Sequence, residues 1–177
     1  MPGKVRRIVT GVNAAGRSYI VSDTLFPTTE VKPDEPVRVG LWTTDSAPAS
    51  NKGVRDPVPD GVILRTPPAH RGGSVIRITD IAPDARGAYG PGELSRRGCK
   101  TTPARSARHP GFHATDTVDY AICLEGEVWA VLDEAETLMR PGDVLIQRGT
   151  YHAWSNRSDR ICRMAFILID AEPLDNH

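Results

Sequence analysis

The residues best suited to chemistry lie in the second half of the chain. In an extended strand successive side chains point to opposite faces, so His113, Thr115 and Asp119 would share one face. An imidazole, a hydroxyl and a carboxylate are groups that bind ions or exchange protons, which makes this face a candidate site. Tyr120 and Ile122 fall on the opposite face, where they can pack against a core or a partner sheet.

A second group of candidate side chains follows a break at Gly149. His152, Trp154 and Asn156 have the same parity and would share one face of a short strand. The segments between the two groups alternate: a turn at 125–127, a strand at 128–131, a turn at 141–143 and a strand at 144–147. The sequence therefore predicts short strands, joined by tight turns, that carry both groups.

These residues resemble the two sequence motifs of the cupin family. The first family motif consists of two histidines, a glutamate and a glycine at fixed spacing. The second consists of a Pro-x-Gly turn, a histidine and an asparagine. The matching positions in this chain are His113, Thr115, Asp119, Gly126, Gly142, Gly149, His152 and Asn156. The chain departs from the motifs at three places: Thr115 replaces the second histidine, Asp119 replaces the glutamate, and Gln147 with Arg148 replaces the usual proline.

The resemblance implies an all-β fold with a single cupin barrel, that is, a double-stranded β-helix or jelly-roll, and an amino-terminal β-hairpin extension. We assign residues 1–60 to this extension and its loops, which would pack on the barrel or on a partner subunit. Residues 61–177 form the barrel, with the motifs in 113–156. Runs 4–12 and 17–22 would form the hairpin. Because such extensions often pair with a second subunit in this family, we expect a homodimer.

Other β-rich segments supply the remaining predicted strands. These are 36–44, 61–64, 74–81 and 160–170. The last is apolar on both faces, as a strand buried on both sides would be, and we expect it to close the barrel. No segment predicts a helix of convincing length; residues 133–139 are compatible with one helical turn or with a tight hairpin.

The resemblance also implies a metal site. His113 and His152 keep two family ligand positions as histidines, and Asp119 keeps the charge of a third as a shorter carboxylate. Two imidazoles and one carboxylate suit a divalent ion such as Fe, Mn, Zn or Ni. We therefore expect His113, Asp119 and His152 to bind a divalent metal, although Asp119 could instead orient an imidazole from behind.

A substrate pocket is expected beside this ion. The side chains expected to line it are Phe112, Thr115, Cys123, Trp129, Gln147, Trp154 and Met164. A wall of this kind suits an aromatic or otherwise flat organic molecule. The prediction is a metal-dependent cupin enzyme acting on a small organic substrate, aromatic or carboxylate- or diketone-like, as an oxygenase or as a lyase, isomerase or decarboxylase. The alternative is a non-catalytic barrel that binds a small molecule without metal.

Composition excludes several partner classes. The 177 residues contain 22 Lys and Arg against 22 Asp and Glu, so no net charge draws the chain to nucleic acid or to an anionic membrane. No apolar run is long enough to span a bilayer and no signal-like segment opens the sequence, so we expect no membrane contact and a cytoplasmic location. Three widely spaced cysteines predict neither a disulfide framework nor a zinc knuckle.

The segment from 83 to 110 is rich in Gly, Pro and basic residues and precedes the first motif. Long connections of this kind often form lids or rims, so we expect it at the barrel mouth. Five basic residues gather in its later part: Arg96, Arg97, Lys100, Arg105 and Arg108. They either form a solvated surface or send an arginine into the pocket to bind a carboxylate or phenolate. His109 is either a solvent-exposed histidine or an extra ligand or proton relay.

Overall fold

The computed structural model describes residues 3–27, 35–62, 72–87, 94 and 98–175. In these residues the chain forms ten β-strands and little helix, as expected for an all-β protein. The strands are β1 (Val5–Val12), β2 (Ser18–Phe26), β3 (Arg38–Thr44), β4 (Ser74–Ile81), β5 (Thr117–Glu125), β6 (Val128–Leu132), β7 (Glu136–Met139), β8 (Val144–Arg148), β9 (His152–Ser155) and β10 (Cys162–Asp170). The helical elements are a 3-10 turn, η1 (Asp84–Arg86), and α2 (Pro103–Arg108).

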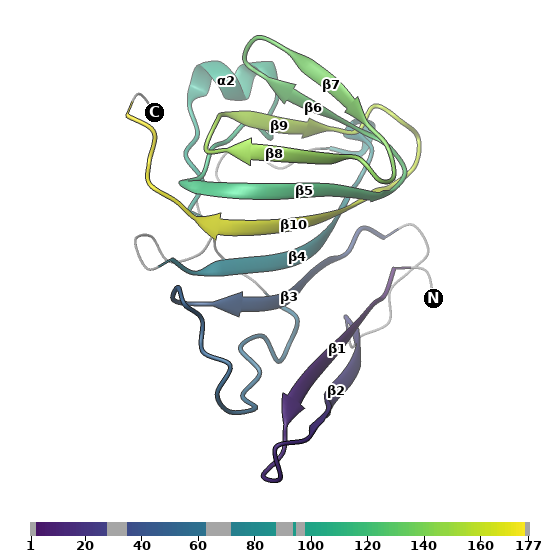
Figure 1. The fold of residues 1–177 in the computed structure, drawn as a ribbon. Helices are drawn as coiled ribbons and strands as arrows, with labels where there is room; N and C mark the ends of the chain where they lie inside the picture. Colours follow the sequence, from purple (N-terminus) through teal and green to yellow (C-terminus); the bar gives the residue numbers. More distant parts are fainter. Residues whose placement is uncertain (1–2, 28–34, 63–71, 88–93, 95–97, 176–177) are drawn as a thin grey trace.

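The strands form three antiparallel sheets. The largest has the order β3-β4-β10-β5-β8, and a three-stranded sheet has the order β7-β6-β9. Figure 1 shows these two sheets as the body of the molecule, with the two-stranded β1-β2 sheet lying beyond β3. This arrangement is the predicted jelly-roll barrel with its amino-terminal hairpin. The β10 strand, which we expected to close the barrel, lies at the centre of the larger sheet, between β4 and β5.

The alternation of side chains in β5 and β10 decides which face of the large sheet is buried. Asp119, Ala121 and Cys123 of β5 are buried, whereas Tyr120 and Leu124 between and beyond them are exposed. The main core lies on this inner face and contains Val75, Ile81, Ala121, Cys123, Val128, Ala130, Met139, Cys162, Met164, Phe166 and Leu168. The parity predicted for the first motif is therefore confirmed, and it brings the polar candidates to the inside of the barrel.

A second apolar cluster covers the other face of the three-stranded sheet. It contains Phe112, Ala114, Val131, Tyr151 and Ala153, with Trp129 packed against it. Side chains alternate along β6 and β9. The even-numbered residues, among them Ala130 and Trp154, belong to the main core or pack against it, so the odd-numbered residues face the second cluster. The segment just before β5 therefore packs on the outside of the smaller sheet.

The amino-terminal region is both an extension and a part of the barrel. In the β1–β2 hairpin, the Asn13 side chain accepts hydrogen bonds from the Ala15 and Arg17 amides, which fixes the turn. Arg7 lies over the Phe26 ring at 4.6 Å and pairs with Asp56. Strand β3, although inside residues 1–60, pairs with β4 and so belongs to the larger sheet. Of the short strand predicted at 61–64, residues 61–62 are not in a strand and 63–64 lie outside the described residues.

Residues 83–110 contain more local structure than the sequence predicted. Helix α2 begins where the Thr102 hydroxyl accepts a hydrogen bond from the Arg105 amide at 3.4 Å, with Pro103 in the first turn. The helix has only six residues, which is too short to give a clear apolar period in the sequence. Residues 136–139 form β7, so the tight-hairpin interpretation of 133–139 is the correct one. Neither helical element in the described part of the chain is long or apolar enough to cross a membrane.

Candidate functional site

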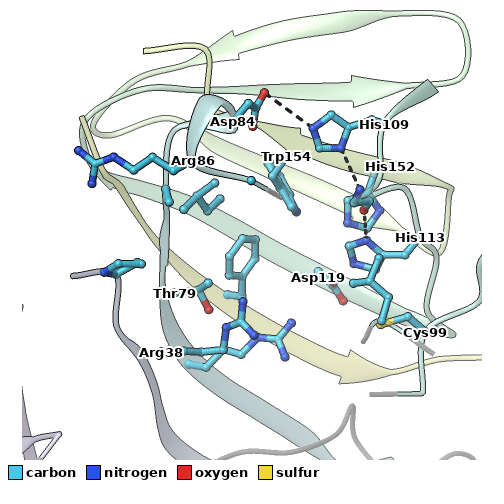
Figure 2. A pocket seen from close by; sticks show the side chains of 18 residues that line it. Arg38, Thr79, Asp84, Arg86, Cys99, His109, His113, Asp119, His152 and Trp154 are labelled. Carbon is cyan, nitrogen blue, oxygen red and sulfur yellow. Dashed lines mark hydrogen bonds and ion pairs between the residues drawn. The ribbon is translucent and has the colours of Figure 1, made fainter. Parts of the chain in front are cut away.

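A cavity of about 400 Å³ opens inside the barrel. It is lined by residues of β3, β4, β5, β9 and β10, together with residues of the segments 82–87 and 109–113. Figure 2 shows His113, His152 and Asp119 on one side of it and Arg38 and Thr79 on the other. Both ends of the basic segment contribute, through Asp84 and His109 among others, so the segment forms part of the cavity rim.

Two histidines from distant parts of the sequence meet in this cavity. His113 and His152 form an antiparallel bridge, in which the amide of each donates to the carbonyl of the other at 2.9 Å. Residues directly opposite in such a bridge have side chains on the same face, and the two imidazole centroids are 4.4 Å apart. The resemblance to the cupin motifs predicted this meeting, and the backbone pairing accounts for it.

Backbone carbonyls fix the tautomer of both rings. The Nδ1–H of His113 donates to the Gly111 carbonyl at 2.8 Å, and the Nδ1–H of His152 donates to the Thr150 carbonyl at 3.0 Å. Because a carbonyl can only accept, Nδ1 carries the proton and Nε2 of a neutral ring keeps its lone pair. Burial lowers the pKa of His113 to about 4 and that of His152 to about 3, so both rings are neutral near pH 7.

Asp119 is a buried carboxylate beside the histidines. Its side chain is bonded to the Thr117 hydroxyl, which is 2.6 Å from the Thr115 hydroxyl. Its Oδ1 atom is buried and has no hydrogen-bond partner. Burial raises the pKa of Asp119 to about 6, and the Thr117 hydroxyl and the charge of Arg77 oppose the rise. A buried acceptor without a donor is unusual and marks a place where a ligand can bind.

These groups fit a divalent metal ion in part. Two neutral imidazoles present Nε2 lone pairs to one cavity, and a ligating imidazole commonly bonds its other nitrogen to a backbone carbonyl. Among the described residues, however, no group of three or more His, Cys, Asp or Glu side chains is close enough together to hold an ion. The pair therefore fits two ligand positions, and Asp119 lines the same cavity.

Comparison with known proteins gives the family. No protein-family model matches the chain. Oryzines biosynthesis cluster protein J of Aspergillus oryzae is 31% identical over 162 residues, which are 84% of this chain and 78% of that protein. The cupin-domain-containing oxidoreductase virC of Hypocrea virens is 27% identical over 181 residues, which are 98% of this chain and 80% of that protein. The chain belongs to the cupin superfamily.

Other proteins match smaller parts of the chain or match at lower identity. Phomopsin biosynthesis cluster protein C' of Diaporthe leptostromiformis is 32% identical over 138 residues, which are 76% of this chain. This chain spans 61% of the length of that relative. Among solved structures, the cupin domain of Schizosaccharomyces pombe Cnp3 superposes with a TM-score of 0.46 at 10% identity, covering 93% of this chain and 87% of that one.

The cupin cavity contains only part of the predicted site. Seven side chains were expected to line the pocket beside the metal. Among the described residues that line the cavity, Trp154 is the only one of these seven. Phe112 and Trp129 belong to the second apolar cluster, which lies on the face of the smaller sheet that is turned away from the cavity. Cys123 and Met164 pack in the main core, where a small and a flexible side chain fill the interior.

Thr115 and Gln147 are buried but serve other contacts. The Thr115 hydroxyl is bonded to that of Thr117. The Gln147 amide donates to the Thr150 carbonyl at 3.0 Å and also contacts the Thr150 hydroxyl. Thr115 therefore stabilises the start of β5 and Gln147 the turn before His152, and neither is among the described residues that line the cavity.

The arginines that line the cupin cavity are not those of the basic segment's helix. Arg105 forms a two-pronged contact with Asp133 and lies 3.9 Å from the Tyr151 ring centroid, on the outside of the smaller sheet. Arg96 and Arg97 lie outside the described residues. The cavity is instead lined by Arg38 of β3, Arg77 of β4 and Arg86 of η1. The period of β4 already placed Arg77 and Thr79 on one face, but nothing in the sequence showed that this face was the inner one.

His109 is part of the cavity and not a solvent-exposed histidine. Its side chain is 14% exposed, and its Nε2 lies 3.8 Å from Asp84 Oδ2. Its Nδ1 accepts a hydrogen bond from the Gly111 amide, so Nε2 of the neutral ring carries the proton and faces the carboxylate. Figure 2 shows this pair above the two motif histidines. Nδ1 is thus bonded within the chain and Nε2 faces the Asp84 carboxylate, which leaves His109 poorly suited as an additional metal ligand.

Proposed function

We propose that this cupin is a metal-dependent enzyme that acts on a small organic substrate, with His113 and His152 as ligands of a divalent ion. One observation carries the proposal. Two neutral imidazoles lie side by side in one cavity, and each has its Nδ1–H committed to a backbone carbonyl, so both Nε2 atoms are available to a ligand. Fe, Mn, Zn and Ni all accept such ligands.

Asp119 is the proposed third group of the site. Its buried Oδ1 lacks a donor, and a nearby cation or a proton would satisfy it. When bound, a divalent ion supplies Lewis-acid polarisation of a substrate oxygen. The cavity walls exclude water from the bound substrate and hold its reacting end against the histidine pair. Relatives named cupin-domain-containing oxidoreductases support an oxidoreductase over a lyase, isomerase or decarboxylase.

Metal content of purified protein tests the proposal. The protein is stripped with EDTA, offered Fe(II), Mn(II), Zn(II) or Ni(II) separately, and analysed for metal after desalting. We expect close to one ion per chain with at least one of them, and loss of that ion in the His113→Ala, His152→Ala double variant. His109→Ala is the matched control, because it removes from the same cavity a histidine whose Nδ1 is bonded to the Gly111 amide and whose Nε2 faces Asp84.

Three outcomes decide between the proposals. Retention of the ion in the double variant would place the metal elsewhere and refute the assignment. Loss of the ion in Asp119→Asn as well would support the carboxylate as a ligand. Absence of binding with all four ions would favour the second candidate, a metal-free barrel that binds a small molecule. The observation behind that candidate is that the described residues contain no group of three metal-binding side chains close together.

We also propose a homodimer in the cytoplasm. The outer face of β5 and β8 exposes Tyr120, Leu124, Val144 and Ile146, and the register sets Tyr120 opposite Ile146. Strand β8 is an edge of the larger sheet, and exposed apolar edges are usually covered by a partner. The three cysteines are free thiols, which fits a reducing compartment.

A further inference from the structure

One end of the cavity is built from β3 and β4 and carries positive charge. Arg38 stands opposite Thr79 in the antiparallel register, and Arg77 lies two residues before Thr79 on the same face of β4. All three line the cavity. The Thr79 side chain is 7% exposed, and its hydroxyl is buried without a hydrogen-bond partner. The two guanidinium groups thus flank a buried hydroxyl that a ligand could satisfy.

The charges of the described lining residues do not cancel. Arg38, Arg77 and Arg86 stand against two carboxylates, Asp84 and Asp119. Asp84 already accepts hydrogen bonds from the Ser155 hydroxyl at 2.6 Å and from the Asn156 amide at 3.1 Å.

Aromatic rings connect the cationic end to the histidine pair. In the register, Arg77 stands opposite Phe166, and its guanidinium lies 5.8 Å from the centroid of that ring. Phe166 contacts Trp154 edge-to-face at 5.3 Å, and Trp154 contacts His152 at 5.5 Å. Phe166 and Trp154 both line the cavity. A flat apolar ligand would therefore pack against these rings with one end near Arg77 and the other near the histidines.

We infer that the substrate of this cupin is a carboxylate on an aromatic or otherwise flat apolar body, with its carboxylate bound by Arg77 and Arg38 and its reacting end held at His113 and His152. This inference rests on the proposed function for the role of the histidine end. A guanidinium presents five N–H donors in a planar fork that matches a carboxylate, so it can hold a contact within the chain and still bind the ligand in two-pronged fashion. The Thr79 hydroxyl donates a further hydrogen bond to the carboxylate.

Paired probes that differ only in charge test the inference. Benzoate is compared with benzamide, and 2-naphthoate with 2-naphthamide, by titration calorimetry and ligand-observed NMR at pH 7.5. The protein is used as purified and again after EDTA, so that binding of a carboxylate to a metal is separated from binding to arginine. We expect each carboxylate to bind at least ten times more tightly than its amide in both preparations.

Two substitutions at Arg77 identify the group responsible. Arg77→Met keeps an apolar stem over Phe166 and removes the charge, so carboxylate affinity should fall at least tenfold while amide affinity changes less than twofold. Arg77→Lys keeps the charge without the fork and should give an intermediate affinity. Arg160→Met is the control for net charge, because that side chain is 88% exposed on the surface. Far-ultraviolet circular dichroism and thermal melting establish that each variant is folded.

The inference is overturned if neither carboxylate binds, if amides bind as well as carboxylates, or if Arg77→Met weakens both members of a pair equally. These results are independent of the proposed metal. A protein that binds no ion but prefers carboxylates through Arg77 keeps this inference and loses the metal assignment. A protein that binds one ion through its histidines without preferring carboxylates keeps the metal assignment and loses this inference.

Discussion

Replacing Asn156 should loosen the wall of the cavity as well as the fold. Its side chain is fully buried, and its amide nitrogen donates to the carbonyls of Ile81 at 2.8 Å and of Arg160 at 2.7 Å. Its oxygen accepts from the amide of Ser158 at 3.1 Å and from the Ser158 hydroxyl at 2.7 Å. The backbone of Asn156 also exchanges hydrogen bonds with Asp84, a cavity residue. Asn156 thus connects the end of β4, the β9–β10 loop and the cavity rim.

The magnitude follows from which partners water can reach. In Asn156→Ala the Ile81 carbonyl stays buried without a donor, which costs about 2 kcal/mol. The other three contacts are part-buried or near exposed residues, and their loss costs about 0.5 kcal/mol each because water replaces them. We therefore expect a loss of about 3.5 kcal/mol in the free energy of unfolding, and a melting temperature lower by about 7 to 14 °C.

Urea denaturation at pH 7, followed by tryptophan fluorescence, measures this loss. Asn156→Asp separates the missing donors from the missing volume: it keeps the shape but turns an oxygen toward two carbonyls, so it should destabilise at least as much as alanine. Ser158→Ala is the matched control and should cost less than about 1 kcal/mol, since it removes only one part-buried partner. If Asn156→Ala and Asn156→Asp each cost less than 1 kcal/mol, the amide does not hold these segments together.

Three further predictions concern other parts of the chain. Asp80→Asn should cost about 3 kcal/mol in urea denaturation, because Asp80 is 2% exposed and receives two hydrogen bonds from Arg163, at 2.7 and 2.8 Å. Burial raises the pKa of the Cys99 thiol to about 11, so its alkylation by iodoacetamide should be at least about tenfold slower than that of glutathione at pH 8 and should accelerate as the pH rises toward 11. An alkylation rate independent of pH would contradict this. Sedimentation should give twice the 19.3 kDa of one chain, with monomers for Ile146→Lys and an unchanged dimer for the control Val62→Lys, whose side chain is also exposed; monomers already in the wild type would exclude the dimer.

The motif region could be predicted well because its information is local. The period of two in β5 places Asp119 and Cys123 inside and Tyr120 outside, and the turns at 125–127 and 141–143 fall where glycines with positive φ end each strand. The same alternation places His152 and Trp154 on one face of β9. The meeting of His113 with His152 could be predicted only through the resemblance, because no local pattern gives the pairing of two strands so far apart in the chain.

The pocket wall could not be predicted in the same way. Alternation shows which side chains share a face of a strand. It does not show which face lines the cavity and which packs against another segment. Trp129 and Phe112 are apolar residues beside the motifs, yet the smaller sheet has a second buried face, formed where the segment before β5 packs on it. A strand buried on both faces presents two apolar sets, and the sequence does not distinguish the one that lines the cavity.

The two ends of the cavity differ in their relation to the cupin motifs. The histidine end is formed by His113, which precedes β5, by Asp119 of β5 and by His152 of β9, all of them motif positions. The cationic end belongs to β3 and β4, where Arg38, Arg77 and Thr79 lie outside both motifs. A ligand that spans both must satisfy the unpartnered hydroxyl of Thr79 and the orphaned oxygen of Asp119. Substitutions in β3 and β4 should therefore change which molecule binds, whereas substitutions at the histidines should change what happens to it.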